Sequence, residues 1–467
     1  MVVSPPRPRP AVAPMSPGRL RAAFAVLLLG MLLAMLDTTV VGTAMPTIVA
    51  QLGGLDRLSW VVTAYTLTTA ASTPIWGKLG DLYGRKRVHL SAIALFTVAS
   101  VACGFAQDMT QLIAFRAVQG LGGGGLAVGA LSLIGVLVPP RDRGRYQGLT
   151  ASVMAAGQIG GPLFGGVVTS LLGWRWNFYL NLPLGLVVFA ATAFVLVLPP
   201  TPRRRVHLDV GGALLLATAV TGLLLLTTGT GFAAVLAPVT VVAFGAFVWV
   251  ERRSREPVLP LTLFAHRNIR LTTVIIFVVG VISFGTITFV PLFQQTVQGA
   301  SASGSGTLLL PMTLAVVVAS QVAGRVSSRT GRYRIFPVIG AACMAAGCAV
   351  LATAHAGTPV WLTSAALVLI GAGLGLSTQM MTLIAQNTVP AGEIGVATAN
   401  TTMFRTIGGA IGTSVFGALL TGGTLVTGMS RIFTAAAVVA AVAAVAAWRI
   451  RETPLRSTGA VGAAAGR

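Results

Sequence analysis

The sequence predicts an all-α membrane protein with fourteen spanning helices. Of the 467 residues, 55% are hydrophobic and only 9% are charged, whereas soluble domains carry roughly 25% charged residues. The mean hydropathy of +0.85 indicates more apolar surface than one water-soluble core can bury. The third observation is a series of apolar runs, each near the roughly 20 residues that a spanning helix needs. These runs leave no room for a separate soluble domain.

The apolar runs form a block of six, a middle pair and a second block of six, each bounded by Arg, Gly, Pro or polar clusters. The first run continues past Asp37 without a cleavage site, so we expect a span rather than a signal peptide. A polar loop, residues 251–270, separates the middle pair from the second block. The expected spans are 22–47, 58–77, 88–106, 110–138, 148–172 and 180–198, then 210–229 and 232–250, then 271–293, 306–326, 335–356, 359–386, 396–421 and 430–449.

Basic residues predict the orientation, because Lys and Arg concentrate in cytoplasmic loops. If the N-terminus is inside, 27 of the 32 basic residues lie in cytoplasmic segments and three lie in outer loops. Both termini are therefore expected in the cytoplasm. The net charge of +22 follows from these loops, so it does not indicate a nucleic-acid partner. The expected organisation is a disordered cytoplasmic tail (1–21), a six-helix bundle (22–198), two extra helices with a cytoplasmic linker (199–270), a second six-helix bundle (271–449) and a cytoplasmic tail (450–467).

The sequence predicts that the two six-helix blocks are an internal duplication, the alternative being that Gly- and Arg-rich inner loops recur in any protein with many spans. The segment from Gly77, GKLGDLYGRKR, recurs as GRVSSRTGRYR from Gly324, an offset of 247. IGGPLFG from Ile159 matches IGGAIG from Ile407 at an offset of 248, and PPRDRG from 139 matches PAGEIG from 390 at 251. Repeats of this kind are typical of transporters, which place the substrate site between them.

The loop after the second span carries a glycine and aspartate pattern: Gly77, Asp81, Gly84, Arg85, Lys86 and Arg87. This pattern resembles the signature of the major facilitator superfamily, and the whole chain is similar to its fourteen-span drug:proton antiporters. The resemblance implies the major facilitator fold, two six-helix bundles plus two extra central helices. It also implies that Asp81 acts as a cytoplasmic latch of the outward-open state. A solvated loop explains the arginines but not an aspartate between glycines.

Two ionisable residues lie within apolar runs and are candidates for proton coupling. Asp37 is the sole acidic residue deep in a span, and Arg116 precedes Gln-Gly in the fourth run, as in a motif that the superfamily associates with proton transfer. A carboxyl group in lipid favours its neutral form, so it can load a proton and release it near a cation. The alternatives are a purely structural role for Asp37 and snorkelling of Arg116 to the interface.

The fifth run contains Gly157, Gly161, Pro162, Gly165 and Gly166, which resembles the antiporter motif of the superfamily. Glycine and proline together bend a helix and let a neighbour pack closely where the halves rock. The resemblance favours export over import.

Arg405 is a further candidate in the thirteenth run, near the place that Gly157 holds in the repeat. One interpretation is that it faces the cavity, where it binds an anionic group or neutralises a helix end. We expect no metal site, because His and Cys have no ligand spacing, and no cofactor other than the coupling proton. The sequence shows neither paired carboxylates nor a nucleophilic set of residues, so nothing in it indicates an enzyme.

The predicted function is proton-driven export of small amphipathic compounds, such as drugs, across a bacterial inner membrane by alternating access. We expect a monomer in contact with membrane lipid. No nucleotide-binding motif is present, so the energy must come from an ion gradient, and 100 mV supplies about 2.3 kcal/mol per charge. The alternatives are export of one endogenous metabolite or lipid and, from another class, a non-transport membrane protein.

Overall fold

The computed structural model describes residues 16–54, 57–198, 209–227, 233–254, 256–299, 307–420 and 424–455, and every regular element in these ranges is a helix. The predicted tail up to residue 15, the start of the linker at 199–208 and the tail from 456 lie outside the described residues. The helices are α1 (Pro17–Leu52), α2 (Leu58–Tyr83), α3 (Arg85–Gly104), α4 (Met109–Leu137), α5 (Pro140–Leu172), α6 (Trp176–Tyr179), α7 (Asn181–Val195), α8 (Val210–Thr227), α9 (Ala233–Glu251), α10 (Arg267–Thr296), α12 (Leu310–Thr330), α13 (Ile335–Ala352), α14 (Val360–Thr388), α15 (Ile394–Leu420) and α16 (Leu425–Trp448), with short 3-10 helices at Leu261–Ala265 and Ala391–Glu393.

Twelve helices of the described part are long and apolar enough to cross a membrane, with α6 and α7 counted as one span. α8 is a shorter apolar helix. α2 has 26 residues, but its threonines and its charged end lower its hydropathy. Together these make fourteen helices, so the predicted fold class is confirmed.

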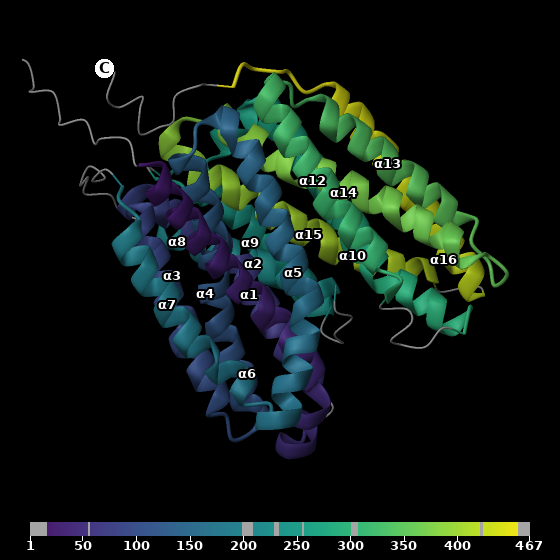
Figure 1. Cartoon of the computed structure of the whole chain (residues 1–467), viewed down its shortest axis with the longest axis horizontal. Coiled ribbons are helices and arrows are strands. Elements are labelled where there is room, and N and C mark those ends of the chain that lie inside the picture. The colour runs from purple at the N-terminus through teal and green to yellow at the C-terminus, as the bar shows by residue number, and fades with distance from the viewer. Residues whose placement is uncertain are drawn as a thin grey trace, which may run out of the picture.

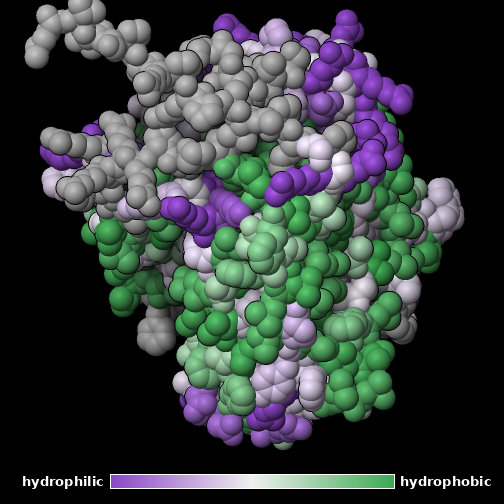
Figure 2. All heavy atoms as spheres, turned by 60° about the vertical axis from the view of Figure 1, so that its left-hand side comes forward, coloured by the Kyte–Doolittle hydropathy of each residue, from purple (hydrophilic) through white to green (hydrophobic). Residues whose placement is uncertain are grey.

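The helices form two halves, α1 to α7 and α10 to α16, which converge at one end and diverge at the other (Figure 1). The halves meet where α2 packs on α15 and α5 packs on α12. Figure 2 shows hydrophilic residues at the two ends of the visible face and a hydrophobic band between them. Such a band is expected for helices whose middle portions face lipid.

Several helices begin before the expected boundaries. α5 starts at Pro140 rather than 148, and α10 starts at Arg267 rather than 271. α1 starts at Pro17, where Ser16 accepts a hydrogen bond from the N–H of Arg19 as the N-cap. Hydropathy detects only the apolar length of a helix, so it misses turns that extend beyond it into polar residues.

The extra helices α8 and α9 pack together and contact α2 and α15 through α8. Between them and α15 lies an apolar cavity of about 430 Å³, lined by residues such as Val220, Phe244, Phe264 and Phe404. Lys78 of α2 forms an ion pair of 2.9 Å with Glu256 in the segment after α9. These contacts place the middle pair against the line where the two halves meet.

Candidate functional site

Asp37 and Arg116 form a buried ion pair inside the N-terminal half. Asp37 lies in the middle of α1 and Arg116 lies in the second turn of α4. The Arg116 Nη1 and Asp37 Oδ2 atoms are 2.6 Å apart, and each side chain is 1% exposed. Moving each charge out of water costs several kcal/mol, and a close ion pair with additional hydrogen bonds offsets this cost. The structure places in direct contact the two residues that the sequence predicted for proton coupling.

Two amides complete the coordination of the Asp37 carboxylate. Gln119 Nε2 and Asn181 Nδ2 each donate a hydrogen bond of 2.8 Å to Asp37 Oδ1. Asn181 also donates to Ser100 Oγ at 2.8 Å. The carboxylate thus accepts from α4 and α7 at once, and Asn181 ties it to α3.

Arg116 has contacts that do not depend on Asp37. Its Nη1 donates to Gln119 Oε1 at 2.7 Å, and its Nε donates to the Val61 carbonyl at 3.4 Å. The guanidinium lies over the Tyr65 ring, 4.1 Å from the centroid, where cation–π attraction stabilises the charge. The cation therefore keeps some stabilisation when the carboxylate is neutral.

Gln119, Asn181, Ser100 and Tyr65 were not predicted as site residues. Gln119 stands three positions after Arg116, so both side chains share one helix face. Asn181 is the one amide side chain in the otherwise apolar sixth run, 180–198. These sequence positions could have indicated Gln119 and Asn181 as site residues. Neutral side chains in an apolar run are a weaker signal than charged ones.

The glycines of the predicted antiporter motif pack α5 against α1 of the same half. A Cβ on Gly161 would overlap Thr39 Oγ1, and one on Gly157 or Gly165 would come within 2.9 Å of α1 side chains. Thr39 Oγ1 donates to the Gly157 carbonyl at 3.2 Å. Around Gly166, by contrast, a Cβ would meet nothing within 4 Å. Pro162 lies inside the continuous helix α5. The motif therefore holds α1 in place two residues from Asp37.

Asp81 joins the two halves by capping the first turn of α15. Its carboxylate accepts hydrogen bonds from the Gly395 N–H at 3.1 Å and the Val396 N–H at 3.0 Å. Arg85 forms an ion pair with Asp81 and donates to the Ala391 carbonyl at 2.7 Å. A carboxylate at a helix N-terminus also interacts favourably with the helix dipole. We call this set of contacts the Asp81 latch.

The glycines of the signature allow the Asp81 latch to form. At Gly77 a Cβ would lie 2.7 Å from the Gly395 carbonyl oxygen and 2.8 Å from the Ala399 Cβ. Gly84 has φ +96° at the turn between α2 and α3, a conformation that favours glycine. Arg87 is exposed beyond this turn. Only a backbone without side chains lets α2 and α15 approach this closely.

A second contact between α5 and α12 matches the Asp81 latch through the duplication. The offsets that relate the repeats take Gly77 to Gly324 and Gly144 to Gly395. Gly144 indeed packs on Gly324, where a Cβ would overlap the Gly144 carbonyl. Ser328 takes the place of Asp81, and its Oγ accepts from the Arg145 N–H at 3.2 Å. The second contact therefore has the same geometry without the buried carboxylate.

Replacing Asp81 with alanine should open the latched end. The substitution removes two hydrogen bonds to the backbone of the other half and the ion pair that holds Arg85 beside the Ala391 carbonyl, a loss of about 1.5–3 kcal/mol for each hydrogen bond to a charged group. A Thr150→Cys reporter measures the opening, because Thr150 of α5 is 0% exposed. We expect faster maleimide labelling of this cysteine in Asp81→Ala than in the parent, with Cys343 replaced by serine.

Asp142→Ala is the matched control, because Asp142 is an exposed acidic residue in the first turn of α5. It removes the same charge from the same end of the molecule. Equal labelling of Thr150→Cys in the parent and both variants would contradict the latch assignment.

Arg405 lies in α15, where its carbonyl faces the backbone of α10 at Gly280. Within the described part of the chain its guanidinium forms no ion pair with a carboxylate, and its place in the repeat matches Gly157. Whether it faces a substrate stays a prediction. Among the described residues no group of three or more His, Cys, Asp or Glu side chains could hold a metal ion.

Several proteins with similar sequences are named as transporters. The chain is 42% identical over 416 residues to an uncharacterized MFS-type transporter of Mycobacterium tuberculosis (strain H37Rv). The matched residues make up 87% of this chain and 60% of that protein. It is 36% identical to the multidrug transporter protein MdtP of Bacillus subtilis, over 84% of this chain and 74% of MdtP. The chain thus spans about three fifths of the length of its mycobacterial relative.

The fold is also similar to solved structures. The human organic anion transporter MFSD10 superposes with a TM-score of 0.71 at 15% identity, covering 93% of this chain and 100% of that one. The proton:xylose symporter XylE superposes with a TM-score of 0.70, covering 96% and 99%. The family model of the Major Facilitator Superfamily matches residues 27–413. This match and the two paired contacts between the halves lead to one conclusion: the chain belongs to the major facilitator superfamily.

Proposed function

We propose that this protein is a proton-coupled antiporter that exports small amphipathic compounds across a bacterial inner membrane. The observation that carries this proposal is the ion pair of Asp37 and Arg116, each side chain 1% exposed. A buried carboxylate that is held by a cation and two amides is suited to exchange a proton, because either charge state finds partners in the site.

The contacts of the pair suggest how one proton changes the site. While Asp37 is ionised, it draws α1, α4 and α7 together through Arg116, Gln119 and Asn181. A proton on Asp37 removes the charge attraction, and Arg116 then relies on Gln119, the Val61 carbonyl and the Tyr65 ring. Proton binding would thereby loosen α1 from α4 without leaving a bare cation.

The contrast between the two ends of the molecule supports alternating access. The Asp81 latch and the α5–α12 contact close one end, while the halves diverge at the other (Figure 1). The distribution of basic residues assigns the closed end to the cytoplasm. Under this orientation we propose that the structure is the outward-open state, from which release of the latch would open the cytoplasmic side.

Export of drug-like compounds is supported by the names of relatives. MdtP is called a multidrug transporter, and a second Bacillus subtilis relative, 33% identical over 85% of this chain, is called multidrug resistance protein 3. The resemblance of the α5 glycines to the antiporter motif supports the same direction of transport.

Arg116 variants should separate charge from geometry. Arg116→Ala leaves Asp37 buried without a cation, which typically costs 3–5 kcal/mol, so we expect loss of transport. Arg116→Lys keeps the charge but loses the planar group whose Nη1 and Nε contact Asp37 and the Val61 carbonyl together, so partial transport is expected. Dye efflux from cells at matched protein levels measures both. Equal activity of the two variants would show that the positive charge has no role.

A growth-inhibition panel tests the proposed substrate class. An efflux-deficient bacterial host expressing the protein should tolerate several chemically unrelated amphipathic drugs at higher concentration than a host expressing Asp37→Asn. Tolerance to a single compound would instead favour a dedicated exporter. No change for any compound, with the protein present in the membrane, would contradict drug export.

A further inference from the structure

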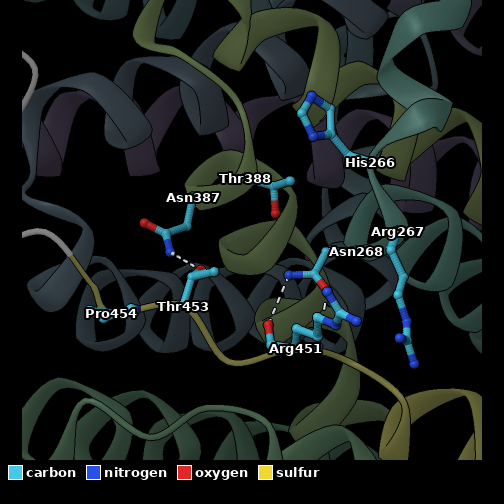
Figure 3. A pocket seen from close by; sticks show the side chains of 8 residues that line it. All are labelled: His266, Arg267, Asn268, Asn387, Thr388, Arg451, Thr453 and Pro454. Carbon is cyan, nitrogen blue, oxygen red and sulfur yellow. Dashed lines mark hydrogen bonds between the residues drawn. The ribbon is translucent and has the colours of Figure 1, made fainter.

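A pocket of about 370 Å³, lined mainly by polar and charged residues, lies in the C-terminal half, away from the Asp37 site. It is formed by the start of α10, the end of α14 and the segment after α16 (Figure 3). Its volume falls within the range of about 300–1,000 Å³ that is usual for small-molecule sites. The side chains that matter here are His266, Arg267, Asn268, Asn387, Arg451 and Thr453.

Two asparagines fix the walls of this pocket. Asn268 Nδ2 donates to the Arg451 carbonyl at 2.9 Å, and the Arg451 N–H donates to Asn268 Oδ1 at 3.1 Å. Asn387 Nδ2 donates to Thr453 Oγ1 at 3.2 Å. Figure 3 shows these bonds holding the segment after α16 against α10 and α14. The pocket is therefore a built feature rather than a gap between independent loops.

The charges around the pocket favour an anion. Arg267, Arg451 and His266 line it, and no carboxylate is among its described lining residues. The neighbouring Glu452 is engaged elsewhere, since its Oε1 accepts from the N–H groups of Tyr333 and Arg334.

The start of α10 adds to this charge. His266, its N-cap residue, makes no side-chain capping bond, so the first-turn N–H groups of the 30-residue helix keep their partial positive charge. Guanidinium groups beside a helix N-terminus match the charge and shape of a phosphate.

The depth of the pocket corresponds to lipid headgroups. Trp448 ends α16 three residues before Arg451, and it is 63% exposed. The Arg334 Cζ atom lies 5.0 Å from the centroid of the Trp448 ring. Exposed tryptophans at helix ends sit at the headgroup level of a membrane. A phosphate bound at Arg451 would lie at about that level, where basic pockets between helices recognise anionic lipids.

We propose that this pocket binds a phosphate-bearing anion, a chemistry that an anionic lipid headgroup and free phosphate share. All three walls belong to the C-terminal half, so the pocket keeps its shape when the halves rock. The ligand therefore stays bound to the C-terminal half during the transport cycle and is not a transported substrate. The site adjoins the segment 389–393 that leads into α15, through which it would steady the partner of the Asp81 latch.

Native mass spectrometry of the full chain in detergent tests this site with three probes: dioleoyl phosphatidylglycerol, dioleoylglycerol and inorganic phosphate. The pocket variant is Arg267→Gln with Arg451→Gln. The control is Arg329→Gln with Arg332→Gln, which removes one exposed arginine in the last turn of α12 and one just after it. Thermal unfolding without lipid checks that both variants fold.

We expect phosphatidylglycerol to bind the parent and the control, with about tenfold or more weaker binding to the pocket variant, because two charged hydrogen bonds are lost. Displacement by millimolar inorganic phosphate, or binding of phosphate alone, would identify free phosphate as a sufficient ligand and supports the site. Equal binding of both charged probes to the pocket variant and the control, dioleoylglycerol binding as tight as phosphatidylglycerol, or no binding to the parent would overturn it.

Discussion

Asp37→Asn should abolish proton-driven accumulation of substrate while leaving downhill exchange. The amide cannot ionise, so the variant cannot carry a proton or pair with Arg116. In inverted membrane vesicles with an imposed pH gradient, we expect dye accumulation at the level of vesicles without the protein. Counterflow exchange, which needs only the conformational cycle, should continue at a measurable rate.

Two comparisons make this result specific. Asp108→Asn changes an aspartate that caps α4 through the Gln111 N–H at 2.8 Å, so it should keep uphill transport. A stability measurement accounts for the buried cation that Asp37→Asn leaves without a counter-ion. Uphill accumulation by Asp37→Asn at the parent rate would exclude Asp37 as the proton carrier.

Gly161→Leu should inactivate transport, because α1 and α5 touch at this residue. Even a Cβ there would overlap Thr39 Oγ1, and overpacking by a whole side chain costs about 1–3 kcal/mol or more. The variant would push α1 away from α5 two residues from Asp37. Dye efflux at matched expression, with thermal unfolding in parallel, measures the loss.

Gly166→Leu supplies the matched control within the same motif. A Cβ on Gly166 meets nothing within 4 Å, so this substitution should leave efflux near the parent level. If both leucine variants fail equally, or Gly161→Leu is active, the close packing of α1 on α5 is not what the motif provides.

The fold could be predicted from sequence because lipid imposes a simple rule. Every spanning helix must be long and mostly apolar. The sequence contains fourteen such runs, and they correspond to the fourteen helices of the fold. The boundaries of α5 and α10 could not be predicted, because their first turns are polar and leave no hydropathy signal. The duplication also indicated which helices correspond, and the paired contacts at Gly77 and Gly324 fit that correspondence.

The site was predictable where charge is rare and not where partners are neutral. Asp37 and Arg116 stand out as ionisable groups in apolar runs, whereas Gln119 and Asn181 do not. Asp81 accepts hydrogen bonds from the backbone N–H groups of Gly395 and Val396. Every residue except proline has such a group, so the sequence does not indicate which ones Asp81 contacts. Only the packing of α15 against α2 places those groups within reach.

Proton movement in proteoliposomes tests the proposed coupling most directly. Purified protein is reconstituted with a pH-sensitive dye inside, and a gradient of a substrate identified by the drug panel is imposed without any initial pH gradient. Substrate flow in the parent should drive protons in the opposite direction and change the internal pH, whereas Asp37→Asn should move substrate downhill with no pH change. Substrate flow without proton movement in the parent, or the same pH change in Asp37→Asn, would contradict proton coupling through Asp37.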